Sequence, residues 1–284
     1  MQELDDYIKK VKNLPPAPRI LPELLQLLRQ DDVDSSKVVN LIAFDPSLTA
    51  SVLQLCNSAF FSSGAPVANL PEAVSRLGFQ QVYQLVAAIT GARALSPPQK
   101  GYGIDQGELW KHSVTAAVAA QLIAKKLGDD ESAVFTAALL HDVGKIILAD
   151  ALEHIYTKLI EETEREQQSL LETEKKLLGV QHAEIGGRLL SRWKFPPNLV
   201  AAVWFHHHPK AAEPHQRLAA YVYLGNMIAH FMGHTYGRGA FALRGRTEAL
   251  EILGLDADVL PHYMIETFDQ LKTVEALFSI GSKS

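Results

Sequence analysis

The sequence is poor in cysteine and in net charge, and each shortage excludes a class of protein. Its single cysteine, Cys56, excludes an internal disulfide and indicates a reducing compartment. The net charge of −5 provides no general attraction to nucleic acid or anionic lipid. No apolar run reaches the ~18 residues that span a bilayer, and residues 1–14 lack the apolar core of a signal peptide. We therefore expect a cytoplasmic protein without nucleic-acid or membrane partners.

The strict alternation of apolar and polar residues that is typical of half-buried strands is also missing. Apolar residues recur instead at helical spacing between recognisable start and stop signals. Asp34 and Asn69 are typical N-caps, Ser169 with Glu172 is typical of a capping box, and Gly78 is expected to end a helix. The sequence predicts an all-α protein.

A length of 284 residues with 47% hydrophobic content is enough for two helical lobes. Residues 96–107, SPPQKGYGIDQG, are dense in proline and glycine and form the best linker candidate. We expect a first helical lobe over residues 1–95 and a second over residues 108–284, packed against each other.

The stretch Ala137–Ala149, AALLHDVGKIILA, places His141 and Asp142 together within an apolar run. Burying an unpaired carboxylate among aliphatic side chains costs several kcal/mol. A metal ion removes that cost because it gives both polar groups a charged partner. A His–Asp pair satisfied by hydrogen bonds or by a neighbouring cation removes it as well. Both interpretations stay open at this point.

Further polar residues occur at the edges of other predicted helices. Glu108 and His112 lie four residues apart and so share a helix face, and Lys145 follows the His–Asp pair by about one turn. His182 begins one predicted helix, and His206 and His207 end another. Imidazole and carboxylate groups are suitable ligands for iron, manganese, zinc or nickel. His208 is either a further ligand or a solvent-exposed neighbour, and the second is favoured. The remaining histidines, expected at the surface or as caps, are His154, His215, His230, His234 and His262.

Several spaced motifs resemble the HDOD (HD-related output domain) family, within the superfamily of HD-domain metal-dependent phosphohydrolases that also includes the HD-GYP phosphodiesterases. They are LPPAP at residues 14–18, FDPSLTASVLQLCNSAFF at 44–61, AVSRLGFQQV at 73–82 and HAEIGGRLLSRWKFPPNLVAAVWFHHHP at 182–209. The resemblance extends from about Leu14 to Asn226, and it implies that the second lobe is an HD-like helical bundle.

The resemblance also implies a site for one or two divalent metal ions. Asp142 is expected to bridge the two ions and, with Lys145, to serve in any catalysis. The remaining expected ligands are His112 and His141 for one ion, and His182, His206 and His207 for the other. Glu108 and Asn226 are candidate additional ligands. A phosphate or nucleotide is the ligand expected beside the metals, where Lys145 meets the anion.

Two departures from the superfamily pattern weaken the expectation of catalysis. Asn226 stands where the resemblance places a closing aspartate, so the site near His112 and His141 lacks a charged ligand. Pro209 and Lys210 follow the histidines where a GYP segment is expected, which argues against hydrolysis of cyclic di-GMP.

The resemblance therefore favours a regulatory output module in bacterial signal transduction that acts through contacts with signalling proteins. The alternative is an active metal-dependent phosphohydrolase that acts on a nucleotide or cyclic nucleotide. A third interpretation is a structural scaffold without metal.

Overall fold

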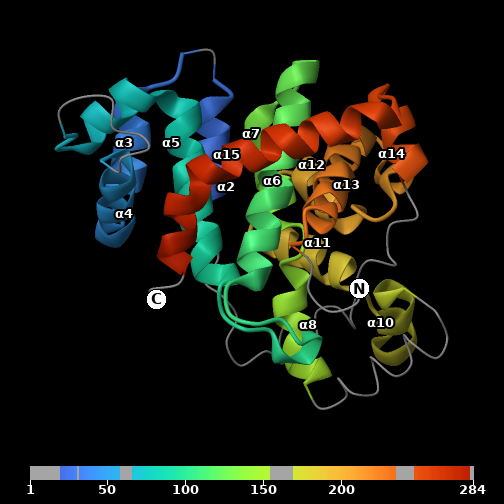
Figure 1. The fold of residues 1–284 in the computed structure, drawn as a ribbon. Helices are drawn as coiled ribbons and strands as arrows, with labels where there is room; N and C mark the ends of the chain where they lie inside the picture. Colours follow the sequence, from blue (N-terminus) through green and yellow to red (C-terminus); the bar gives the residue numbers. More distant parts are fainter. Residues whose placement is uncertain (1–19, 31, 58–65, 154–168, 235–245, 282–284) are drawn as a thin grey trace.

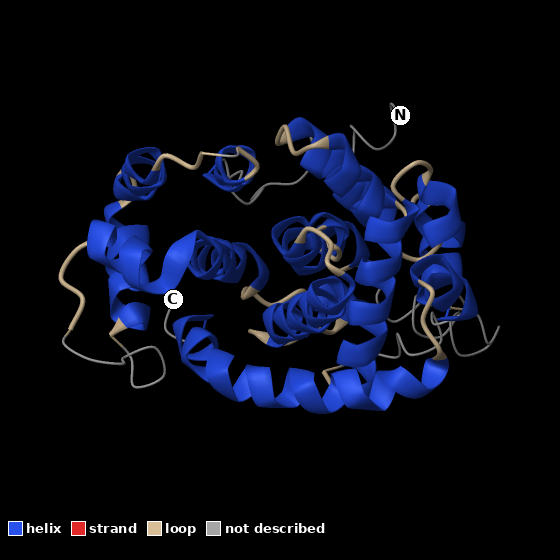
Figure 2. Ribbon diagram, turned by 90° about the horizontal axis from the view of Figure 1, so that it is seen from above, coloured by secondary structure: helices blue, strands red, loops and turns tan. Residues whose placement is uncertain are grey.

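The computed structural model describes residues 20–30, 32–57, 66–153, 169–234 and 246–281, and in these residues it is built from helices and loops (Figures 1 and 2). The helices of the first half are α2 (Ile20–Leu28), α3 (Ser35–Ala43), α4 (Pro46–Cys56) and α5 (Leu70–Leu95). Those that follow are η1 (Lys100–Tyr102), α6 (Glu108–Leu127), α7 (Glu131–Leu140), α8 (Gly144–Leu152), α10 (Leu170–Leu178), α11 (His182–Arg192), α12 (Pro197–Trp204), η2 (Pro209–Ala212), α13 (Gln216–Phe231), α14 (Arg246–Leu253), η4 (Ala257–Val259) and α15 (Leu260–Gly281). The all-α prediction is confirmed.

The helix boundaries follow local signals in the sequence. The side chains of Asp34 and Asn69 accept hydrogen bonds from backbone N–H groups in the first turns of α3 and α5. Ser169 and Glu172 form the predicted capping box at the start of α10. Gly78, with φ of 77°, interrupts α5 with a kink, where the sequence predicts an end followed by a new helix. These residues therefore act within one or two turns of their own position, as capping theory expects.

Helices α6, α7 and α13 pack on one another at the centre of the second half, and α8, α11 and α12 complete that bundle (Figure 1). Two glycines allow unusually close backbone approaches. A Cβ on Gly225 of α13 would lie 2.3 Å from the carbonyl oxygen of Ala116 on α6. A Cβ on Gly144 of α8 would lie 1.9 Å from the carbonyl oxygen of His182 on α11. These approaches set the distances between the helices that supply the polar cluster described below.

The buried side chains of the two halves form one continuous apolar cluster, which extends from Leu21 to Leu271. The long helix α15 contributes to this continuity, because it crosses the molecule and contacts both α5 and α6 (Figure 1). Helix α15, which belongs to the predicted second lobe, therefore also packs against α5 of the first.

Residues 96–107 form a closed loop rather than an extended connection. The Gly107 N–H donates to the Ser96 carbonyl oxygen at 2.8 Å, and Gln99 and Ile104 form an isolated antiparallel bridge. Tyr102, on the short helix η1, is buried within this loop. The loop thus directs an aromatic side chain toward the second half of the protein.

One stretch of the described residues, Glu131–Ala149, is long and apolar enough to cross a membrane by length and composition, with a mean hydropathy of 1.5. The stretch contains Asp142 and Lys145, so it reaches this value as an average and is not an unbroken apolar run. The window is 94% buried inside the protein, where α7 and α8 pack against other helices. Its apolar character is therefore accounted for by its place in the core.

Candidate metal centre

Five elements bring the predicted ligands to one place inside the helical bundle. His112 lies on α6, and His141 and Asp142 occupy the turn between α7 and α8. His182 is the first residue of α11, and His206 and His207 lie in the turn after α12, separated from it by Phe205. All of these side chains are buried, and the largest exposed fraction among them is 9%, at His207.

The Asp142 carboxylate lies at the centre of this arrangement, and its two oxygens face different histidines. Oδ2 is 3.3 Å from His141 Nε2 and 3.8 Å from His112 Nε2. Oδ1 is 3.2 Å from His182 Nε2 and 3.9 Å from His206 Nε2. The carboxylate therefore has the orientation of a bridge between two groups of imidazoles.

The same residues form two groups whose candidate ligand atoms lie within 4.8 Å of one another. One group is His112, His141 and Asp142, and the other is His182, His206 and His207. The groups adjoin, since the ring centroids of His141 and His206 are 5.0 Å apart. Three nitrogen or oxygen donors at such spacing suffice for a transition-metal site.

The Nδ1 atoms of four histidines are held by hydrogen-bond acceptors outside the cluster. His112 Nδ1 lies 2.6 Å from the His234 carbonyl oxygen, His141 Nδ1 2.6 Å from that of Ala138, and His206 Nδ1 2.7 Å from that of Val203. His182 Nδ1 lies 2.9 Å from both oxygens of Glu174. A carbonyl or carboxylate oxygen can only accept, so each Nδ1 donates a proton outward.

In a neutral ring this tautomer leaves the Nε2 lone pair directed at Asp142. The Nε2 atoms of His141 and His206 have no hydrogen-bond partner within the described part of the protein. Buried nitrogens without partners are uncommon, and a lone pair that faces a carboxylate oxygen is repelled by it unless a cation or a proton lies between them. Metal-ligating histidines characteristically donate the other ring N–H to a carbonyl or carboxylate. The donor set thus fits a divalent transition metal.

The protonation states also favour metal binding. Burial, reinforced by neighbouring imidazoles, holds the pKa values of His112, His206 and His207 well below 6.5. Burial alone would raise the pKa of Asp142, but the His141 imidazole, the Lys145 ammonium and hydrogen bonds hold that pKa well below 3.8. The site therefore presents three neutral imidazoles, those of His112, His206 and His207, and an ionised carboxylate, the forms that metals bind.

His182 differs from the other histidines in its electrostatic surroundings. Burial alone would lower the pKa of His182, but the carboxylates of Glu174 and Asp142 raise that pKa above 6.5. Its Nε2 also lies 3.1 Å from His207 Nε2. A second proton on His182 therefore has two acceptors within reach, so this ring can stabilise the cluster in the absence of metal.

Lys145 lies at the site as predicted from its spacing. Its Nζ donates to Asp142 Oδ2 at 2.7 Å, and the side chain is buried. The ammonium group supplies a positive partner for Asp142. This is the second interpretation left open by the sequence, in which a neighbouring cation rather than a metal ion satisfies the carboxylate. It does not reach the unsatisfied nitrogens of His141 and His206, however. The cation on Lys145 therefore accounts for the carboxylate but not for the imidazoles.

The two candidate additional ligands lie in different surroundings. Asn226 is buried on α13 with its Oδ1 3.0 Å from His112 Nε2, so it borders the first group. In the neutral ring His112 Nε2 carries a lone pair and accepts a hydrogen bond. The Asn226 amide donates this hydrogen bond when the side chain is flipped, so that its NH₂ group takes the place of Oδ1. Glu108 accepts from the Asp105 N–H at 2.8 Å and stabilises the start of α6. Glu108 is part of neither group of candidate ligands in the described residues.

Sequence reasoning missed three residues beside the centre. His230, expected at the surface, packs its ring 4.7 Å from that of His112, and burial lowers its pKa to about 4. It follows Asn226 by one helical turn, and that spacing is a signal available in the sequence. Glu174 and Tyr102 form a hydrogen-bonded pair behind His182. No sequence pattern marks this pair, because 72 residues separate its members.

Other histidines outside the predicted ligand set differ in where they lie. His208 is exposed, and His262 has a side-chain exposure of 71%, as expected. The His234 backbone carbonyl, rather than its side chain, takes part in the centre. His154 lies outside the described residues.

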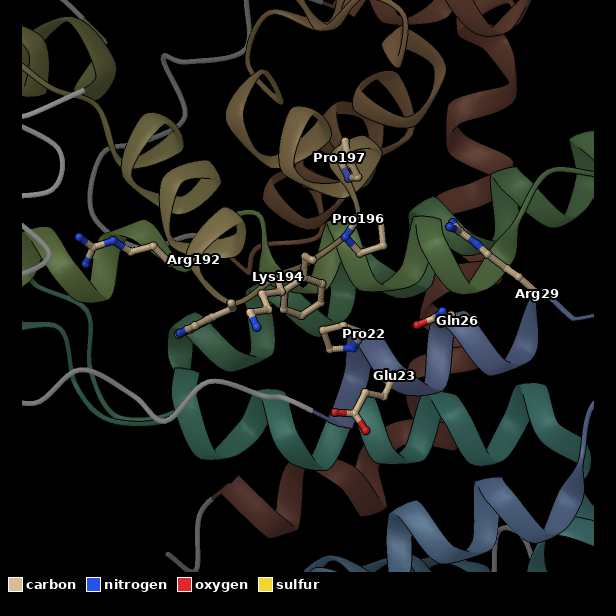
Figure 3. A pocket seen from close by; sticks show the side chains of 10 residues that line it. Pro22, Glu23, Gln26, Arg29, Arg192, Lys194, Pro196 and Pro197 are labelled. Atoms are coloured by element: carbon tan, nitrogen blue, oxygen red, sulfur yellow. The ribbon is translucent and has the colours of Figure 1, made fainter.

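A groove of about 880 Å³ lies away from this centre, between α2 and the turn that joins α11 to α12 (Figure 3). Pro22 and Glu23 line one side, and Trp193, Lys194 and Pro196 line the other. None of the predicted metal ligands lines this groove. The space available there to a ligand is therefore separate from the histidine cluster.

Comparison with known proteins decides the family. A model of the HDOD domain matches residues 14–209, which is more than half of the chain. The chain belongs to the HDOD family. The resemblance noted in the motifs is thus confirmed.

Solved structures similar to this HDOD chain share its fold. A protein from Shewanella amazonensis SB2B, named as a candidate phosphohydrolase, is 28% identical with a TM-score of 0.70, and the match covers 97% of both chains. An HDOD domain protein of unknown function from Geobacter sulfurreducens is 22% identical with a TM-score of 0.75, over 98% of this chain and 96% of that one.

A curated relative of this HDOD chain is an uncharacterised protein of Treponema pallidum (strain Nichols), 29% identical over 228 residues. The match covers 78% of this chain and 43% of the relative, so the chain spans less than half of that protein's length.

Proposed function

We propose that this HDOD chain is an output module of bacterial signal transduction that holds one or two divalent transition-metal ions and acts through contacts with signalling proteins. The observation that supports metal binding is the common orientation of four histidines, whose Nδ1 atoms are anchored outward while Nε2 faces Asp142. An imidazole cluster that served only as hydrogen-bonded packing is expected to pair all its nitrogens, but the Nε2 atoms of His141 and His206 have no partner among the described residues.

The ligands divide between the two groups. His112 and His141 would hold one ion, His182, His206 and His207 the other, and Asp142 would contribute one oxygen to each. Such an ion, when bound, supplies Lewis acidity and links helices that approach from distant parts of the sequence. The metal identity is left to measurement, because this mixed donor set suits iron, manganese, nickel and zinc alike.

The burial of the ligands supports a regulatory rather than a catalytic role. Catalytic metal sites keep an open coordination position that solvent and substrate reach. Here the ligating side chains are at most 9% exposed, and the neutral amide of Asn226 borders the first group. Ligands that are buried this deeply join structural elements, so metal binding would stabilise the arrangement of helices that holds them.

Exposed apolar side chains support action through protein contacts. Phe44 is 83% exposed, and Phe231, Ile265 and Phe268 are also exposed. A contiguous apolar patch at a surface is suited to a protein interface, and Ile265 and Phe268, three residues apart, share one face of α15. The partner we propose is therefore a signalling protein that covers apolar surface.

A second candidate function is metal-dependent hydrolysis of a phosphoester, such as a nucleotide or cyclic nucleotide. Lys145 favours it, because a buried ammonium 2.7 Å from Asp142 is placed to attract a phosphate toward the carboxylate. The Shewanella protein named as a candidate phosphohydrolase adds support at 28% identity. In this function Asp142 and Lys145 are the catalytic residues.

Elemental analysis of protein purified without chelators tests the proposal. We expect about one or two transition-metal ions per chain, a marked loss of metal in His141→Ala and His206→Ala, and no loss in His262→Ala, whose side chain is 71% exposed. If wild-type protein contains no metal and His141→Ala is as stable as wild type, only the interpretation as a structural scaffold without metal remains. Turnover in a phosphoester screen that disappears in Asp142→Ala would replace the regulatory role by the enzymatic one.

A further inference from the structure

Glu174 is a fully buried carboxylate that stands directly behind one of the proposed metal ligands. It lies on α10, with an exposed fraction of 0%. Both of its oxygens lie 2.9 Å from His182 Nδ1, and Oε2 also accepts from the His182 backbone N–H at 2.8 Å. One carboxylate therefore holds both the ring and the backbone of His182.

Tyr102 supplies a further donor to the same carboxylate. Its hydroxyl donates to Glu174 Oε1 at 2.8 Å, and the tyrosine side chain is buried. The two oxygens of Glu174 thus receive hydrogen bonds from His182 and from the loop of residues 96–107. Because a hydrogen bond to an ionised group is stronger than one between neutral groups, this arrangement fixes the Glu174 side chain in one orientation.

We propose that Glu174 is a positioning residue of the metal centre and that Tyr102 in turn orients Glu174. This inference rests on the proposed function, since it concerns how His182 binds the ion. Glu174 keeps the proton of His182 on Nδ1, aims Nε2 at the second metal position and, through its negative charge, makes that nitrogen a better donor.

The Tyr102 contact also connects the centre to another part of the fold. Residues 96–107 follow α5 directly, and η1 of this loop packs against α8, which begins two residues after Asp142. The loop that follows α5 therefore contributes, through Tyr102 and Glu174, to the support of His182.

The experiment measures Co²⁺ binding to full-length, chelator-treated protein by direct titration, with the visible d–d absorption spectrum as a second readout. We expect Glu174→Gln to weaken Co²⁺ binding by about 10- to 100-fold and to change the spectrum. In Tyr102→Phe we expect a loss of about 3- to 10-fold. The control variants are Glu172→Gln on the same helix and Tyr83→Phe, which removes another buried hydroxyl, one that bonds to Thr136.

The outcomes separate this inference from the proposed function. Wild-type protein that binds no Co²⁺ contradicts the proposed function itself. If wild-type protein binds Co²⁺ and both Glu174→Gln and Tyr102→Phe bind it with unchanged affinity and spectrum, the positioning role is wrong and the metal site stands. If Glu174→Gln does not fold, Tyr102→Phe decides, compared with Tyr83→Phe as the measure of a merely structural loss.

Discussion

The ammonium nitrogen of Lys145 lies 2.7 Å from Asp142 Oδ2, the same oxygen that faces His112 and His141. Both members of this ion pair are buried, with side-chain exposures of 6% and 2%. The carboxylate at the centre of the proposed metal site thus has a cationic partner within its own chain. This contact gives metal-free protein a way to tolerate a buried negative charge.

Replacement of Lys145 by methionine is expected to destabilise metal-free protein by about 3 to 5 kcal/mol, because it leaves Asp142 as a buried charge without an ammonium partner. Saturating metal is expected to recover most of this loss, since an ion then compensates Asp142. The measurement is urea unfolding with chelator and with metal. In the control Lys175→Met, whose exposed ion pair with Glu184 spans 3.0 Å, the change is expected to be at most about 1 kcal/mol. Equal losses with and without metal would contradict the prediction.

Asn226→Asp tests whether the first ligand group lacks a charged member. Asn226 Oδ1 is 3.0 Å from His112 Nε2, so the new carboxylate joins Asp142 beside the first group. We expect metal-free protein to be less stable by about 3 kcal/mol and metal affinity to rise by about tenfold. Isothermal titration with Mn²⁺ or Zn²⁺ measures the affinity. An unchanged affinity would place Asn226 outside the coordination sphere.

Gly144→Ala is expected to disturb the centre through the backbone. The added Cβ would lie 1.9 Å from the His182 carbonyl oxygen. This oxygen belongs to the backbone of α11, so it cannot rotate away from the new methyl group as a side chain can. We expect a loss of about 3 kcal/mol together with weaker metal binding. Gly186→Ala is the matched control from the facing helix, where the Cβ would meet the Val203 side chain at 3.1 Å. The loss expected there is about 1 kcal/mol, and thermal unfolding of both variants gives the comparison.

Metal-free protein is expected to lose stability as the pH falls below 6.5. The pKa values of His112, His206 and His207 lie well below 6.5 in the folded chain because these rings are buried. Between the unfolded and the folded pKa, the unfolded chain binds more protons, so stability rises with pH and falls on acidification. Each such proton reduces stability by about 1.4 kcal/mol per pH unit. Urea unfolding with chelator from pH 7.5 to 5 measures the slope, and a flat profile would contradict the burial of neutral imidazoles.

Prediction from the sequence succeeded where a feature depends on neighbouring residues. Asp34, Asn69 and Ser169 cap the helices that they were expected to cap, because a cap bonds to backbone groups two or three residues away. Gly78 was correctly identified as an interruption, since its positive φ is a local property. The motifs also indicated the HDOD family, which the family model confirms.

The same reasoning failed where a contact joins distant segments. His230 was expected at the surface or as a cap; it is partly buried, and the packing of α6 against α13 brings its ring to His112. Residues 96–107, the predicted linker, close through the Gly107–Ser96 hydrogen bond and include the buried Tyr102, a contact pattern that their composition does not reveal. The stretch Glu131–Ala149 passes a length and composition test for a membrane span, and only its neighbours show that it lies in the core.

The amino-acid order by itself determined the helices, their caps and the types of side chain available for chemistry, because periodicity and capping act over a few residues. Only the folded chain decided which of those side chains meet. Helix packing turned His112, His141, His182 and His206 toward the two oxygens of one carboxylate and set Glu174 and Tyr102 behind them. The physical reason is that burial and backbone approach, as at Gly144 and Gly225, are properties of helix pairs, which no single segment specifies.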